Sequence, residues 1–109
     1  MVRLEDFKKI DIRVGKIIEV EDFKETRNPA YKLKIDFGEL GEKESSAQTT
    51  KLYSKKDLKN QQIIAVVNFP SKRIVDFKSE VLIIGIIKEE GEVILLKPER
   101  EAPLGYKIS

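Results

Sequence analysis

The chain has 109 residues, of which 40% are hydrophobic and 37% are charged, and it contains neither cysteine nor histidine. This length suits one compact domain rather than two. The missing residue types exclude disulfides, thiolate or imidazole metal ligands, and catalysis by a cysteine or histidine side chain. The formal net charge is only +2, so the protein as a whole is not strongly basic. We expect a single domain over residues 1–109.

No feature of the sequence directs the chain to a membrane. The opening MVRLEDFKK has no apolar core of the kind that a signal peptide needs. No run of apolar residues reaches the length of a transmembrane helix. We therefore expect a cytoplasmic protein without membrane insertion.

The first half of the chain predicts a short helical turn, formed by LEDFKKI, and three strands. Apolar residues at spacing two from Ile10 to Val20 predict the first strand, and Gly15 inside it is typical of a bulge or a sharp coil. A loop over residues 22–30 ends in Asn-Pro, a turn signal. Alternation from Tyr31 to Phe37 predicts the second strand, and a more polar third strand is expected over residues 43–49.

The second half predicts a short helix followed by further strands. Ser54 as the N-cap and Asp57 at the third helical position predict a helix from Tyr53 to Leu58. Residues 68–80 carry prolines and charges and are interpreted as a long loop. Apolar runs predict strands over Ile63–Val67, over Val81–Ile87 with a break at Gly85, and over Val93–Leu96.

The predicted order of elements is three strands, a short helix and then two or more strands. This is the order of an OB-fold. We therefore predict an all-β protein: a five-stranded OB-fold β-barrel with a short helix between strands 3 and 4 and terminal extensions. Such barrels bind ligands on the outer face of strands two and three and on the loops beside it. Residues 43–78 carry eight basic and three acidic side chains, net +5, which is enough for a local field that attracts phosphate.

The side chains that this fold would bring to its binding face are cationic, amide or hydroxyl groups. Cations neutralise phosphates, whereas amides and hydroxyls bond sugars and base edges. Each residue also has an ordinary alternative as a solvated strand or turn position, so the hypothesis depends on their convergence. The predicted RNA-binding residues are Asn28, Lys32, Lys34, Ser45, Gln48, Asn68, Lys72, Arg73, Lys78, Ser79 and Glu80.

Aromatic side chains allow a second interpretation of the same face. Phe69 and Phe77 bracket the basic segment, where they either stack bases or pack in the core. If the ligand is a polypeptide instead, Tyr31, Phe69 and Phe77 would line an apolar groove or an open strand edge. Both interpretations remain open at this point.

Five segments in order resemble the CsaA family: FKKIDIRVGKIIEVEDF, NPAYKLKIDFG, SSAQTT, VVNFPSKRI and FKSEVLIIG. They run from about Phe7 to the C-terminus. That family is similar to the tRNA-binding OB domains of methionyl-tRNA synthetase C-termini. Tyr31 replaces an aspartate that is usual in the broader group, and Ser79-Glu80-Val81-Leu82 replaces its Ser-x-Gly-Met; both differences fit the CsaA branch.

The resemblance implies a homodimeric OB-fold whose terminal extensions pack at the interface and whose barrel face binds tRNA. For CsaA members it also implies an export-related chaperone that binds unfolded polypeptides. The small core and the unpatterned tail lead us to expect that residues 1–8 and 97–109 cross a dimer interface.

An enzyme is disfavoured because the usual catalytic side chains are missing. Asp36, Asp57 and Asp76 have no spacing that is typical of a carboxylate pair or a metal site. No cofactor and no metal is expected.

Overall fold

The computed structural model describes residues 1–109, and its strands confirm the all-β OB-fold prediction. The strands are β1 (Ile12–Asp22), β2 (Tyr31–Asp36), β3 (Glu42–Ala47), β4 (Gln62–Val66), β5 (Lys72–Ile74), β6 (Phe77–Ser79), β7 (Leu82–Ile83), β8 (Gly85–Ile87) and β9 (Val93–Leu95). The helices are α1 (Leu4–Lys8), η1 (Gly38–Leu40), α2 (Lys55–Leu58) and η2 (Glu89–Gly91).

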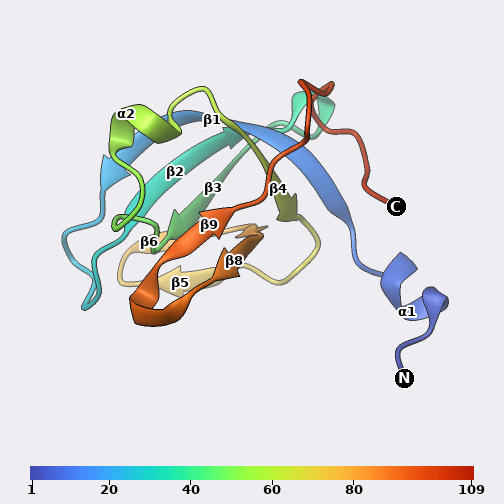
Figure 1. Ribbon diagram of the computed structural model, residues 1–109, viewed down its shortest axis with the longest axis horizontal. Helices are drawn as coiled ribbons and strands as arrows, with labels where there is room; N and C mark the ends of the chain where they lie inside the picture. Colours follow the sequence, from blue (N-terminus) through green and yellow to red (C-terminus); the bar gives the residue numbers. More distant parts are fainter.

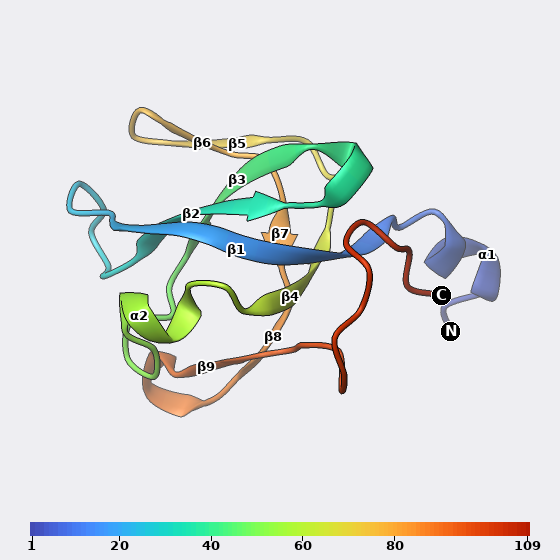
Figure 2. The same ribbon diagram turned by 90° about the horizontal axis from the view of Figure 1, so that it is seen from above.

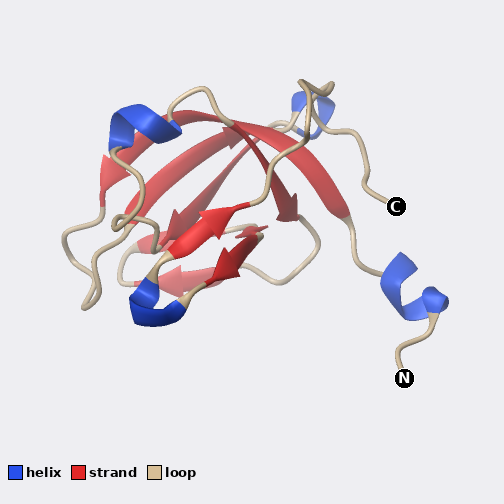
Figure 3. Cartoon of the chain, in the orientation of Figure 1, coloured by secondary structure: helices blue, strands red, loops and turns tan.

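A five-stranded sheet in the order β3-β2-β1-β4-β7 curls into a nearly closed barrel, and two hairpins, β5–β6 and β8–β9, extend from it (Figures 1 and 3). Seen from above, the two hairpins lie on opposite sides of the barrel (Figure 2). Helix α1 and the C-terminus lie together at one end, opposite the β1–β2 loop, in both views. No helix of the chain combines the length and the apolar character that crossing a bilayer requires.

The long strand β1 pairs with two strands: its first half pairs with β4 and its second half pairs with β2. This sharp coiling brings Gly15 against the barrel interior. A Cβ atom added at Gly15 would lie 2.6 Å from Cγ2 of Ile35 and 2.7 Å from Cε1 of Phe37. The glycine is therefore needed for close packing between strands.

The predicted alternation along β1, which places Ile18 and Val20 on the apolar face, is wrong at Ile18. The register against β2 shifts between Ile17 and Glu19, as it does at a β-bulge. Val14 and Gly15 are both buried, so the alternation changes phase before the bulge: Ile17 is 0% exposed and Ile18 is only partly buried. After the bulge Val20 packs against the core again. A strict period of two cannot reveal such a change of phase, which explains why the sequence pattern favoured Ile18.

The core fills the barrel with side chains from the sheet and from α2. Leu58 of α2 is fully buried and belongs to the main core cluster. The predicted capping box of this helix is confirmed: the Asp57 backbone N–H donates to Ser54 Oγ (3.2 Å), and the Ser54 backbone N–H donates to Asp57 Oδ2 (2.9 Å). The bond from the Ser54 backbone N–H, and after it the Ser54 hydroxyl, lower the pKa of the Asp57 carboxyl. The helix itself begins at Lys55, two residues later than predicted.

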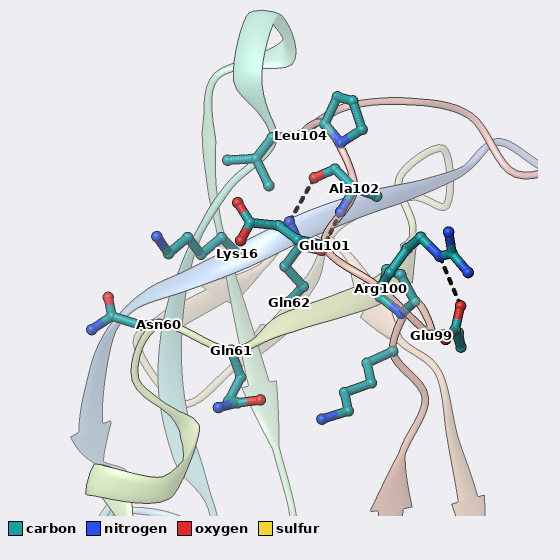
Figure 4. Close-up of a pocket in the computed structure, with 12 residues that line it drawn as sticks. Lys16, Asn60, Gln61, Gln62, Glu99, Arg100, Glu101, Ala102 and Leu104 are labelled. Carbon is teal, nitrogen blue, oxygen red and sulfur yellow. Dashed lines mark hydrogen bonds and ion pairs between the residues drawn. The ribbon is translucent and has the colours of Figure 1, made fainter.

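The C-terminal segment is bonded to its own barrel. Gly105 N–H donates to the Val14 carbonyl (2.8 Å), and Val14 N–H donates to the Tyr106 carbonyl (3.2 Å), so the segment continues the sheet beside β1. The Gln62 side chain accepts from Ala102 N–H (2.9 Å) and donates to Ala102 O (2.6 Å), as Figure 4 shows. These contacts enclose a polar hollow of about 440 Å³ that contains no predicted site residue.

The interpretation of residues 68–80 as a loop is wrong, because they contain the β5–β6 hairpin. Lys72 pairs with Ser79 and Ile74 pairs with Phe77 across a turn at Val75-Asp76. Val75 has a φ of 55°, a left-handed conformation that β-branched residues rarely adopt. The turn has none of the Asn-Gly or Asp-Gly signals from which a hairpin is recognised in sequence, which explains why the pattern did not predict it.

Candidate nucleic-acid interface

The β5–β6 hairpin is fixed to the edge of β3 by three hydrogen bonds. Glu80 N–H donates to the Glu44 carbonyl (2.8 Å), and Glu44 N–H donates to Glu80 Oε1 (3.1 Å). Ser46 N–H donates to Ser79 Oγ (3.2 Å). These bonds join β3, one edge of the sheet, to the end of β6 and to Glu80 just before β7, so they draw the two edges of the sheet together and place the hairpin beside the binding face.

Between β3 and the hairpin lies a groove of about 350 Å³, which we call the β3–hairpin groove. It lies on the face that an OB-fold uses for ligands. Four of the predicted RNA-binding residues, Gln48, Lys72, Ser79 and Glu80, line it together. Its complete lining is Ser46, Gln48, Phe69, Pro70, Lys72, Ile74, Ser79, Glu80, Val81 and Leu82.

An aromatic contact joins the hairpin to the β1–β2 loop. The rings of Phe23 and Phe77 meet edge to face with centroids 5.4 Å apart, and Ala30 and Ile74 complete this small cluster. Edge-to-face pairs of this kind contribute about 0.5–1.5 kcal/mol beyond the burial of their area. The exposed Asn28 of that loop is therefore held on the hairpin side of the barrel. Phe23 was missed from the sequence, since no local pattern marks a partner so far along the chain.

The hairpin carries exposed cations without acidic partners. Arg73 and Lys78 are directly opposite each other across the two strands. Neither they nor Lys72 form an ion pair anywhere in the structure. Like charges placed opposite each other repel, so this arrangement costs stability and creates a local field that favours an anionic ligand.

The two predicted lysines of β2 differ in their surroundings. Both alternate with buried residues, and both are partly buried on the outer face. Lys34 Nζ lies 3.5 Å from Glu19 Oε2 and is neutralised by it. Lys32 Nζ has no acidic partner; it lies 4.8 Å from the centroid of Phe23 and 5.6 Å from that of Phe77, within cation–π range of both rings.

Two predicted contacts are placed elsewhere. Ser45 was expected on an exposed strand face, but it points into the barrel, is 1% exposed, and donates to the Val81 carbonyl (2.9 Å). The Asn68 amide accepts from Asp11 N–H (2.8 Å) and donates to the Lys9 carbonyl (2.8 Å), which holds the segment after α1 against the barrel. Ser45 is thus inaccessible to a ligand, whereas Asn68 is exposed, has its amide bonded within the chain and stays a prediction.

The aromatic residues proposed for a polypeptide groove are also not equivalent. Tyr31 is 7% exposed and donates its hydroxyl hydrogen to the Tyr53 carbonyl (2.8 Å), and Phe77 is 8% exposed. Both belong to the interior rather than to a surface. Phe69, with 46% of its surface exposed, alone presents an accessible ring at the β3–hairpin groove.

A barrel of this topology with a cationic hairpin beside an open groove defines an OB-fold binding module. A family model described as a putative tRNA binding domain matches residues 12–107. The chain therefore belongs to this tRNA-binding domain family.

Solved structures confirm the resemblance to the CsaA family. The chain is 57% identical to a CsaA chaperone from Bacillus anthracis, with a TM-score of 0.96 over 100% of this chain and 99% of that one. It is 55% identical to a CsaA chaperone from Picrophilus torridus, with a TM-score of 0.93 over 100% of both chains.

The match to a methionine–tRNA ligase of Thermococcus onnurineus is 35% identical and covers 98% of this chain but only 14% of that protein. The first curated relatives are thus much longer than this chain.

Proposed function

We propose that the protein is a non-catalytic, cytoplasmic tRNA-binding protein whose ligand lies over the β3–hairpin groove and the outer face of β2. The observation that carries the proposal is a set of cations without acidic partners on neighbouring elements. Lys32 of β2 lies beside Phe77 of the hairpin, and the hairpin itself presents Lys72 on one face and Arg73 with Lys78 on the other. Membership of the tRNA-binding domain family supports it. Cations that have no acidic partner are free to neutralise phosphates.

The proposal is tested by titrating the protein with tRNA at two or more salt concentrations. Each phosphate neutralised by a cation releases a counterion, so the affinity falls as salt rises. Four contacts correspond to a slope of log K against log salt of about −3. Absence of tRNA binding, or binding that does not depend on salt, would contradict the proposal.

A second candidate function is a chaperone that binds unfolded or export-bound polypeptides. The half-exposed Phe69 favours it, and the two CsaA structures are described as chaperones. Light scattering of an aggregating client protein tests whether the protein suppresses aggregation. If an equimolar amount of the protein leaves aggregation unchanged, the chaperone candidate is removed, whereas the tRNA titration is unaffected.

We also propose that the protein acts as a homodimer. Aliphatic side chains on β8 and β9 face water in the single chain: Ile86 is 52% exposed, Ile87 is 82% exposed and Ile94 is 39% exposed. Neighbouring exposed apolar residues of this kind mark interaction surfaces. Because β8–β9 and β5–β6 lie on opposite sides of the barrel (Figure 2), pairing through β8–β9 leaves the groove open.

The terminal segments remain part of the dimer proposal. Met1, Val2 and Leu4 are 125%, 82% and 66% exposed, and α1 buries none of its residues in its own barrel. The C-terminal segment is bonded to its own β1, yet Tyr106 is 67% exposed. We propose that residues 1–8 and 97–109 contribute these side chains to the interface.

Lys32 and Lys34 provide a comparison within one strand. We expect Lys32→Met to weaken tRNA binding about tenfold at low salt and to make the slope of log K against log salt shallower by about one, because a cation without an acidic partner is lost. The control removes the whole ion pair on the same face: Lys34→Met combined with Glu19→Gln leaves the net charge unchanged, so its effect should be much smaller. Filter binding or fluorescence anisotropy measures both. Equal effects of the two variants would contradict the assignment of Lys32.

A further inference from the structure

The β3–hairpin groove has an aromatic wall. Phe69 lies in the segment between β4 and β5, and 46% of its surface is exposed beside Pro70. An accessible ring on a nucleic-acid face is a platform on which an unpaired base stacks. The volume of about 350 Å³ falls in the range of pockets that bind small ligands, about 300–1,000 Å³.

The remaining walls of the groove offer both hydrogen bonds and charge. Gln48 is exposed, and its amide has no hydrogen bond within the chain. Glu80 Oε1 accepts from Glu44 N–H, whereas its second carboxylate oxygen has no partner. Amide and carboxylate groups bond the edges of bases, including exocyclic amino groups. Lys72 lies on the same groove and supplies a cation for a phosphate.

We propose that the β3–hairpin groove binds one unpaired nucleotide of the RNA. Its base stacks on Phe69, the base edge bonds Gln48 and Glu80, and its phosphate contacts Lys72. This inference depends on the proposed RNA-binding function and adds that the RNA presents a single-stranded nucleotide at this position. Paired bases do not suit the groove, because both of their faces are stacked and their pairing edges are occupied.

The protein contains no tryptophan, so Phe69→Trp creates a unique fluorescent reporter at the groove. We expect the emission of this variant to be quenched saturably by tRNA and by a single-stranded oligoribonucleotide, but not by a blunt RNA duplex. Leu40→Trp is the matched control: Leu40 is 40% exposed on η1, which lies far from the β5–β6 hairpin (Figure 1). Its emission should not change with RNA.

The variant Phe69→Ala measures the contribution of stacking. We expect it to bind the single-stranded oligoribonucleotide about tenfold more weakly, with a thermal unfolding midpoint close to that of the unchanged protein because the ring is half exposed. Equal affinity of the two proteins would overturn the inference.

The outcomes separate this inference from the function on which it depends. If tRNA binds with salt dependence while the emission of Phe69→Trp stays constant, the unpaired-nucleotide site is wrong and the tRNA-binding proposal stands. If the emission responds to an unfolded polypeptide and not to RNA, the groove is a polypeptide site and the inference is overturned. If no RNA binds at all, both proposals fail.

Discussion

Replacing Lys72, Arg73 and Lys78 together by alanine is expected to weaken tRNA binding about a hundredfold at low salt. The three cations belong to one hairpin, and none has an acidic partner. Each is therefore available to neutralise a phosphate. Loss of three contacts should also reduce the steepness of log K against log salt by about two to three. Titration of labelled tRNA at several salt concentrations measures both quantities.

The matched control removes the same charge from another part of the barrel. Lys55, Lys56 and Lys59 lie on or directly after α2, which Figure 2 places on the other side of the barrel from β5–β6. Their replacement by alanine changes the net charge by the same amount and should alter tRNA binding little. A loss of affinity as large as that of the hairpin variant would mean that general charge, rather than the hairpin, attracts the RNA.

The variant Ile87→Glu is expected to convert a homodimer into folded monomers. Ile87 is 82% exposed in the single chain, so its replacement removes almost no contact within the barrel. In a symmetric dimer the substitution occurs twice. Each copy loses about 1.5–3 kcal/mol of apolar burial and places a carboxylate in the interface. The dissociation constant should therefore rise at least about a hundredfold.

Sedimentation velocity and circular dichroism test this prediction together. The unchanged protein should sediment as a dimer, and Ile87→Glu should sediment as a monomer with the same far-ultraviolet spectrum. Val75→Glu is the control, because Val75 is an exposed apolar residue of the other hairpin, 52% exposed. This variant should remain dimeric. A monomeric unchanged protein, or a dimeric Ile87→Glu variant, would refute the dimer proposal through β8–β9.

Local patterns determined most elements of this fold. Alternation between apolar and polar residues located β2 from Tyr31 onward and placed Lys32 and Lys34 on its outer face, because successive side chains of a strand point to opposite faces. The capping box at Ser54 and Asp57 was likewise predicted from the sequence, since its bonds join residues only three apart. The order of these elements was sufficient to predict the barrel.

The tertiary structure decided which of the candidate residues meet. Three contacts that shape the candidate interface join residues from different elements. They are the Phe23–Phe77 contact, the bonds between Glu80 and Glu44, and the ion pair of Lys34 with Glu19. Sequence periodicity reports only which face of its own element a side chain occupies. It therefore predicted a cationic binding face, but only the closed barrel distinguished the free Lys32 from the neutralised Lys34, and the exposed Phe69 from the buried Phe77.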